Sequence, residues 1–177
     1  MGEEMFSKDD KKFMRLAIKE QEKAYKRGDY PVAAVLVIDG KLIGIESNSL
    51  VTSKKRISHA EMNLIMKHSS AITSTKRAGK NITLYTTLEP CLMCFGTSVL
   101  HRISRIVYAY IDPDGGATNI LTKNVSGYYS RTWPIIEGGL YAKESQALIL
   151  KFLKKQESQG WKNVLKEHLN VKAVNKK

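Results

Sequence analysis

The pattern of apolar and polar positions predicts a helix and then a β-hairpin at the start of the chain. Ser7 has the form of a helix N-cap with an acid three residues later, and apolar residues recur at helical spacing from there to Gly28. Residues 31–38 are almost wholly apolar, and Asp39-Gly40 separates them from a second strand-like run at 41–46. An Asp-Gly pair between two such runs is a strong hairpin signal.

Helical and strand-like patterns then alternate as far as residue 157. Polar residues at 49–58 and 69–81 predict connections, and 113–116 predict a turn. In chain order the patterned segments are 59–67 (helix), 82–87 (strand), 91–101 (helix), 105–110 (strand), 135–136 (strand) and 141–156 (helix). This order predicts an α/β domain with helices packed on one central sheet. Its strand–helix–strand steps favour parallel neighbours after an antiparallel start.

We predict one domain over residues 1–157, followed by a basic helix or tail over 158–177, with Gly160 interrupting the last long helical run. Apolar and charged fractions of 42% and 26% are those of an ordinary globular protein, which argues against disordered and fibrous classes. The longest apolar run is too short to cross a bilayer, and residues 1–10 carry no apolar signal-peptide core. We therefore expect a cytoplasmic protein with no membrane partner.

Two short motifs carry the candidate chemistry, and each lies where a helix is predicted to begin. The first is His59-Ala60-Glu61, and the second is Pro90-Cys91-Leu92-Met93-Cys94. Cys91 and Cys94 are three residues apart, which places both thiols on one helical face. Near a helix N-terminus, unpaired backbone N–H groups and the helix dipole lower the pKa of a thiol, and thiolate is the form that binds a metal.

Two thiolates and one imidazole make a ligand set that suits zinc. Three protein ligands leave the fourth tetrahedral position to water, whose pKa zinc lowers to about 7. Glu61 lies two residues beyond His59, where its carboxylate can accept a proton from that water and deliver it to the substrate. The predicted site is therefore a catalytic zinc held by His59, Cys91 and Cys94, with Glu61 as general acid and base.

Other interpretations of the cysteine pair stay open at this point. Cys-x-x-Cys also occurs as a redox pair, although a structural disulfide is not expected in a cytosolic chain. A structural zinc would need a fourth protein ligand, for which His68, His101 and His168 are the available histidines. None of these three falls at a predicted helix start.

The net charge of +12 is concentrated in two segments. Residues 52–80 and residues 151–177 each have a net charge of +6, so the rest of the chain is neutral. Two basic blocks on a neutral body are typical of a protein with a polyanionic partner such as a nucleic acid, and equally of a lysine-rich solvated surface. The last segment lacks the wide apolar face of a membrane-surface helix.

The combination H-x-E and P-C-x-x-C is the known signature of zinc-dependent nucleobase deaminases. From Tyr30 to about Lys155 the chain resembles the cytidine deaminase-like superfamily, and most of all its tRNA adenosine deaminase and guanine deaminase branches. Residues 87–94, TLEPCLMC, resemble their T-L-E-P-C-x-M-C segment, and 102–108 resemble the strand entry that follows. The resemblance implies a three-layer α/β sandwich with a five-stranded mixed sheet, one zinc ion per subunit and a homodimer.

The same resemblance suggests two substrate-binding residues. Asn48 lies eleven residues before His59, where relatives carry an asparagine that contacts the substrate. Asp112 follows the strand at 105–110, in a loop that lines the substrate mouth in relatives. Both residues are also ordinary turn formers.

Departures from the tRNA-editing pattern keep three functions open. Relatives read D-P-T-A before H-A-E, where this chain has Lys55-Arg56-Ile57-Ser58, and F-F-R-x-x-R near the C-terminus is replaced by 152–155, FLKK. Relatives also read P-V-G-A where this chain has PVAA at 31–34, and Ser49 follows Asn48 in place of arginine. Conversion of adenosine to inosine in tRNA or another RNA is the first hypothesis. The alternatives are a deaminase of a free base or nucleoside, such as guanine or cytosine, and a catalytically silent RNA-binding subunit.

Overall fold

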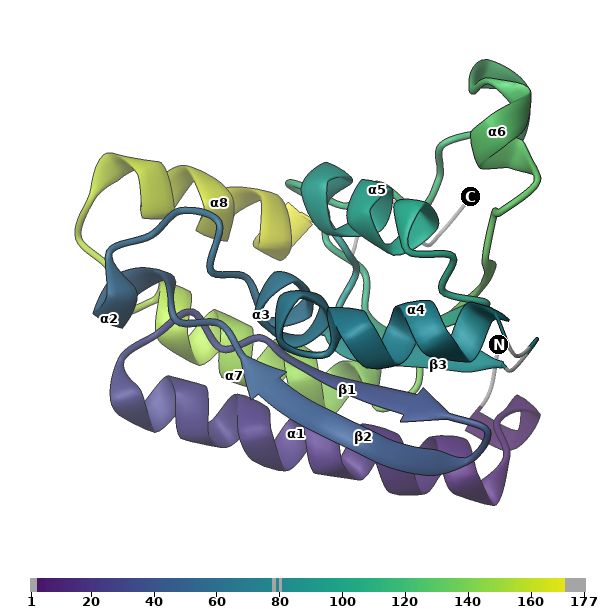
Figure 1. The fold of residues 1–177 in the computed structure, drawn as a ribbon. Helices are drawn as coiled ribbons and strands as arrows, with labels where there is room; N and C mark the ends of the chain where they lie inside the picture. The colour runs from purple at the N-terminus through teal and green to yellow at the C-terminus, as the bar shows by residue number, and fades with distance from the viewer. Residues whose placement is uncertain (1–2, 78, 80, 171–177) are drawn as a thin grey trace.

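The protein, seen in a computed structural model, is a three-layer α/β sandwich (Figure 1). The structure describes residues 3–77, 79 and 81–170. Five strands form one mixed sheet in the order β2-β1-β3-β4-β5. The strands are β1 (Ala33–Ile38), β2 (Lys41–Ser47), β3 (Ile82–Leu88), β4 (Arg105–Tyr110) and β5 (Ile135–Gly138). The predicted fold class, with five strands between helices, is confirmed.

Helices cover both faces of the sheet. α1 (Lys8–Arg27) and α7 (Ala142–Leu153) contact each other on one face, and α3 (Ala60–Lys67), α4 (Ser69–Arg77) and α5 (Leu92–Leu100) cover the other (Figure 1). The remaining elements are η1 (Glu3–Met5), α2 (Leu50–Ser53), η2 (Thr122–Asn124), α6 (Gly127–Ser130) and α8 (Gln159–Asn170). Within the described residues, no helix combines the length and the apolar character that a membrane span requires.

The first helix has the predicted ends. The Ser7 hydroxyl accepts a hydrogen bond from the Asp10 amide at 3.0 Å, and the Asp10 carboxylate accepts one from the Ser7 amide, so the capping box is complete. Gly28 ends the helix in the left-handed conformation with φ of 88°, which a residue without a Cβ adopts readily. The chain then enters β1, which lies between β2 and β3 in the sheet.

One topological prediction is wrong for the first crossover. β1 and β2 form the expected antiparallel hairpin, and β3 is parallel to β4 and β4 to β5. The crossover from β2 does not place β3 beside β2, because β3 pairs with β1 in antiparallel register. β1 is buried at all six positions, which is expected of a strand with a neighbour on each side and helices on both faces.

Two predicted connections contain helices. Residues 49–58 include the single turn α2, and residues 69–81 include α4. The serine and threonine content of α4 lowers its intrinsic helix propensity. Ile72 is 1% exposed and belongs to the main core with Leu64 and Ile65 of α3, so burial of an apolar side chain stabilises this helix.

The C-terminal helix folds back onto the domain. α8 follows α7 after a short connection and packs against it, and Gly160 lies in its first turn. Trp161 contacts Tyr30 and Phe152, with ring centroids 5.2 and 5.5 Å away. His168 is buried beside Tyr110 at the end of β4. Of the predicted basic segment, residues 171–177 lie outside the described part of the chain.

Candidate active site

Two helix N-termini bring the three predicted metal ligands together. His59 is the N-cap residue of α3 and Cys91 is the N-cap residue of α5, both in extended backbone conformation, and Cys94 lies one turn into α5. The Nδ1 atom of His59 is 3.6 Å from the sulfur of Cys91 and 3.6 Å from the sulfur of Cys94. All three ligand atoms lie within 4.8 Å of one another.

The pKa values of the two thiols shift in opposite directions, and this indicates that a cation would stabilise the cluster. The hydrogen bond from Cys94, with help from His59, lowers the pKa of the Cys91 thiol to about 4. The same neighbouring sulfur and burial raise the pKa of Cys94, which is fully buried. The pair therefore holds one negative charge readily, and a divalent cation would stabilise the second. Two sulfurs and one imidazole nitrogen fit zinc, which binds such donors in tetrahedral sites.

The structure offers no fourth protein ligand among the described residues, since His59, Cys91 and Cys94 are the whole of the group able to hold a metal. The Nδ1 atom of His101 lies 3.0 Å from the Thr97 carbonyl oxygen in its own helix. The Nε2 atom of His168 lies 3.7 Å from Asp112. Three protein ligands are the number found in catalytic zinc sites.

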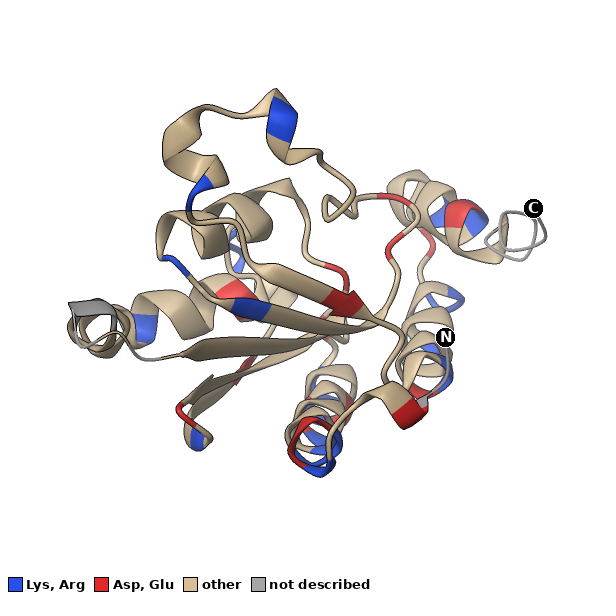
Figure 2. Cartoon of the chain, turned by 90° about the vertical axis from the view of Figure 1, so that its right-hand side faces the viewer, with Lys and Arg blue, Asp and Glu red and all other residues tan. Residues whose placement is uncertain are grey.

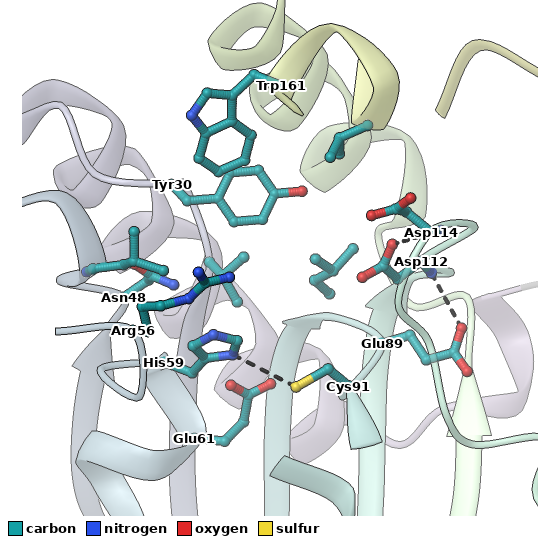
Figure 3. Close-up of a pocket in the computed structure, with 14 residues that line it drawn as sticks. Tyr30, Asn48, Arg56, His59, Glu61, Glu89, Cys91, Asp112, Asp114 and Trp161 are labelled. Atoms are coloured by element: carbon teal, nitrogen blue, oxygen red, sulfur yellow. Dashed lines mark hydrogen bonds between the residues drawn. The ribbon is translucent and has the colours of Figure 1, made fainter. Parts of the chain in front are cut away.

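Glu61 lies beside the cluster in the first turn of α3. Its side chain is 3% exposed, and its Oε1 atom accepts a hydrogen bond of 2.9 Å from the Thr86 hydroxyl of β3. Burial raises the pKa of this carboxyl, which suits a group that must both accept and release a proton. In Figure 3 the carboxylate points toward His59 and Cys91.

Asn48 follows β2 and is held from two sides. Its Oδ1 atom accepts a hydrogen bond from the Leu50 amide at 2.8 Å, and its carbonyl oxygen accepts one from Arg27 at 2.9 Å. Arg27 also forms an ion pair with Asp29, which is fully buried. The Asp29 carboxylate accepts hydrogen bonds from two backbone amides of α2, so the segment that follows Asn48 is held in place as well. The side-chain amide nitrogen of Asn48 donates to no other described residue, so it is available to an acceptor in the pocket.

Asp112 follows β4 in a loop that Glu89 organises. The carboxylate of Glu89 accepts hydrogen bonds from the amides of Asp112 and Thr118, at 3.1 and 3.0 Å. Gly116 is required in this loop, because a Cβ there would lie 2.4 Å from the Glu89 carboxylate and 2.6 Å from a backbone oxygen. Glu89, one residue before Pro90, therefore fixes the position of Asp112.

All these groups meet in one cavity of about 320 Å³, near the lower end of the range for small-molecule sites. His59, Glu61, Cys91, Asn48 and Asp112 line it, and Cys94 is buried and does not line it. Figure 3 shows the arrangement, with His59, Glu61 and Cys91 at the floor, Asn48 and Arg56 on one wall, Asp112 and Asp114 on the opposite wall, and Tyr30 and Trp161 above.

Several lining residues were not predicted as site residues, and Tyr30, Arg56 and Trp161 matter most among them. Tyr30 and Trp161 form an aromatic wall, with ring centroids 5.2 Å apart, and Arg56 extends into the cavity (Figure 3). The loop before His59 carries a weak signal for Arg56, because it departs there from the D-P-T-A pattern. No pattern near Trp161 signals a site, because its position depends on how α8 folds back.

Comparison with known proteins agrees with this geometry. A sequence profile described as the cytidine and deoxycytidylate deaminase zinc-binding region matches residues 7–110. A tRNA-specific adenosine deaminase of Bacillus subtilis is 34% identical over 158 residues, which cover 88% of this chain and 97% of the relative. A tRNA-specific adenosine deaminase of Agrobacterium fabrum is 33% identical over 144 residues, covering 81% of this chain and 93% of the relative.

Solved structures show the same fold. One comes from a study of A-to-I editing by tRNA:A34 deaminases at the wobble position of transfer RNA. It has a TM-score of 0.61 and 32% identity, covering 77% of this chain and 97% of that one. A guanine deaminase from Nitrosomonas europaea has a TM-score of 0.60 and 18% identity, covering 80% of this chain and 83% of that one, and supports the fold alone.

Proposed function

We propose that this chain, which belongs to the cytidine and deoxycytidylate deaminase family and is a zinc-dependent deaminase, converts adenosine to inosine in tRNA. The observation that carries the proposal is that three potential zinc ligands and the Glu61 carboxylate come together at the floor of a cavity large enough for a nucleoside. The similarity to bacterial tRNA-specific adenosine deaminases over most of the chain supports adenosine in tRNA as the substrate.

His59, Cys91 and Cys94 would hold the zinc ion. When bound, zinc supplies the Lewis acidity that activates water for attack on the carbon bearing the amino group. His59, Glu61 and Cys91 line the floor of the cavity and Cys94 is buried, so the substrate reaches the metal site from the cavity. The base must therefore enter with its amino group directed toward His59 and Glu61.

Glu61 moves the protons of the reaction. Its carboxylate accepts a proton from the attacking water and delivers it to N1 of adenine as the bond from oxygen to C6 forms. Glu61 then takes the proton of the hydroxyl now attached to C6 and passes it to the amino nitrogen, so that ammonia leaves as the C6–N bond breaks and the C6 carbonyl forms. The hydrogen bond from Thr86 holds one carboxylate oxygen, and this fixes the orientation of Glu61 for both transfers.

The remaining lining residues bind and orient the nucleoside. The free amide nitrogen of Asn48 can donate to an acceptor on the base or ribose, and Asp112 can accept from a ribose hydroxyl. Tyr30 and Trp161 offer an aromatic wall on which a base can stack. These roles complete the set expected for a pocket that accepts one unstacked nucleotide.

The test is incubation of the zinc-loaded protein with total tRNA, and separately with a panel of free bases and nucleosides. Inosine in tRNA and released ammonia are measured in parallel. We expect inosine and ammonia from tRNA in equal amounts, and none from the Glu61→Gln variant. Deamination of a free base or nucleoside with no inosine in tRNA would establish the alternative substrate class instead.

We also propose that the protein is a homodimer. α5 and the segment 120–133 form an apolar groove of about 320 Å³ on the surface. Leu92 and Leu100 of α5 and Leu121 are 66%, 52% and 53% exposed. Contiguous exposed apolar surface of this kind is typical of protein–protein interfaces, and a second copy of this chain is the occupant that the family resemblance suggests.

Light scattering during size-exclusion chromatography tests the dimer. Leu100→Glu should convert the protein to monomers, whereas Leu42→Glu, at a 45% exposed position on the edge strand β2, should not. A wild-type protein that stays monomeric at micromolar concentration would contradict the proposal. We also propose a cytoplasmic location, because a reducing compartment keeps both cysteines available as zinc ligands.

A further inference from the structure

The loop before His59 places a guanidinium group at the mouth of the cavity. Lys54, Lys55 and Arg56 are consecutive and exposed, and of these only Arg56 lines the cavity. In Figure 3 its side chain reaches over His59 toward the open centre. It is also the one Lys or Arg among the residues that line this cavity.

The backbone that carries Arg56 is well defined by hydrogen bonds. The Ser58 amide donates to the Lys55 carbonyl at 3.0 Å, which closes a β-turn with Arg56 and Ile57 at its corners. The Ser49 amide donates to the Ser58 carbonyl at 3.0 Å and joins this turn to the end of β2. The turn thus holds Arg56 at a fixed place beside Asn48.

The guanidinium has no partner within the described residues. No ion pair or hydrogen bond joins the Arg56 side chain to any other group there, although Arg27 and Arg105 are both paired with carboxylates. The cavity is also lined by four carboxylates: Glu61 lies at the floor, Glu89 accepts backbone hydrogen bonds, and Asp112 and Asp114 lie on the wall opposite Arg56 (Figure 3). The mouth of the cavity therefore has the positively charged Arg56 on one side and the hydrogen-bond acceptors Asp112 and Asp114 on the other.

We propose that Arg56 binds a phosphate group attached to the deaminated nucleoside, so that the enzyme discriminates nucleotide units from free bases. This inference rests on the proposed function. A base that enters with its amino group toward the floor leaves its ribose and phosphate at the mouth. The planar guanidinium matches phosphate oxygens in a bidentate manner, and ribose hydroxyls match the carboxylates opposite.

The phosphate can belong to an RNA backbone or to a free mononucleotide, and both sources are tested. The Glu61→Gln protein, zinc-loaded and full-length, avoids turnover during calorimetric titration. The ligands are adenosine, its 3′- and 5′-monophosphates, and a trinucleotide with adenosine at its centre. The guanosine and cytidine series are titrated in parallel, so that the result does not depend on the identity of the base.

We expect at least one phosphate-bearing ligand to bind roughly 10-fold or more tightly than its nucleoside, the effect of about one charge-assisted hydrogen bond. Adding Arg56→Gln should remove this preference and change nucleoside affinity by less than about twofold. Arg56→Lys should restore part of it, because the charge remains and the bidentate geometry is lost. Lys55→Gln is the matched control, and we expect it to alter mononucleotide affinity by less than about threefold.

An effect limited to the trinucleotide identifies an RNA backbone, and an effect on a monophosphate identifies a free nucleotide. Equal affinity for nucleoside and nucleotide, or no measurable binding of any phosphate-bearing ligand, would overturn the inference. Equal weakening of nucleoside and nucleotide by Arg56→Gln would also overturn it, because Arg56 would then contact the base. A phosphate preference that depends on Arg56, without inosine formation in tRNA, would leave this inference standing and refute the proposed function.

Discussion

At the scale of single residues, the site depends on a histidine and a cysteine that each stand at the N-terminus of a helix. His59 and Cys91 are N-cap residues, so their side chains project beyond the helices toward each other rather than along a helical surface. Glu61 lies two residues inside α3 and approaches from below. The carboxylate therefore stays outside the ligand set while remaining close to it.

The first prediction separates catalysis from metal binding. Glu61→Gln keeps the size and the hydrogen-bonding position of the side chain but cannot carry a proton. We expect turnover to fall by at least about 100-fold, the lower end of general acid–base contributions, while zinc content stays at one ion per chain. Zinc content is measured by mass spectrometry and turnover by ammonia release. Loss of zinc in this variant would show that Glu61 is part of the metal site.

At this scale, the residues that stand in motifs could be predicted from the sequence. His59, Glu61, Cys91 and Cys94 stand in two patterns whose spacing follows from the chemistry, and the structure brings all four together. Asn48 and Asp112 came from the family resemblance, and both line the cavity. Trp161 had no such signal, because it is more than one hundred residues from His59 and reaches the site only through the packing of α8.

At the scale of elements, a charged cluster links the first turn of α1 to β3, β4 and β5. Asp10 forms an ion pair with Arg105 of β4 and accepts a hydrogen bond from the Tyr85 hydroxyl of β3 at 2.7 Å. Arg105 also pairs with Glu137 of β5. Although burial alone would raise it, the pKa of Asp10 lies well below its usual value, because Arg105, Tyr85 and Ser7 all donate to the charged form.

The sign of the pH dependence follows from this depressed pKa. The contribution of Asp10 to the free energy of unfolding is fully present above its unfolded pKa of about 3.8 and is lost as pH falls through the lower folded value. We expect Asp10→Asn to reduce the free energy of unfolding by about 3 kcal/mol at neutral pH, as for a broken buried pair, and by less near pH 3. Urea unfolding at both pH values measures this. The exposed Asp9→Asn is the control, and an effect of Asp10→Asn that is independent of pH would contradict the account.

A second element-scale prediction concerns α8. Trp161 stacks against Tyr30 at the cavity wall, so Trp161→Ala should raise KM about 10-fold, the effect expected when one base loses an aromatic partner. Trp161→Phe should retain most of the affinity because it keeps an aromatic face. Kinetics with the tRNA substrate measure both variants. A lowered melting temperature with unchanged KM would show that Trp161 only supports the packing of α8.

The fold was predictable where local patterns decide it and unpredictable where pairing partners decide it. The capping box at Ser7, the Asp-Gly hairpin and the alternation of elements all depend on nearby residues. The antiparallel pairing of β3 with β1 does not, because Ile82–Leu88 has the same local pattern whichever strand lies beside it. α4 was missed because its stability comes from Ile72 in the core rather than from its own polar composition.

At the scale of the whole molecule, the described basic residues are spread over several elements. Figure 2 shows Lys and Arg on several elements, with Asp and Glu among them. Lys67 pairs with Glu46, and Lys151 and Lys155 lie over the Tyr25 ring. Among the described basic residues, Arg56 lines the cavity and the exposed Lys54 and Lys55 precede it, so this segment is well placed to meet a polyanion.

This charge distribution predicts salt-dependent binding of tRNA. Each phosphate contact releases counterions, so affinity should fall by at least about 10-fold between roughly 50 and 200 mM salt. Filter binding or fluorescence anisotropy with the Glu61→Gln protein measures the slope. An affinity unchanged over this range would count against a polyanionic substrate and would favour a free base or nucleoside.

The proposed catalysis requires a single zinc ion with three protein ligands, and zinc K-edge X-ray absorption of the loaded protein measures this coordination directly. We predict two sulfur neighbours at about 2.3 Å and two nitrogen or oxygen neighbours at about 2.0 to 2.1 Å, with the signature of one imidazole. A shell without sulfur, or one filled by a second imidazole in place of water, would contradict the catalytic zinc site.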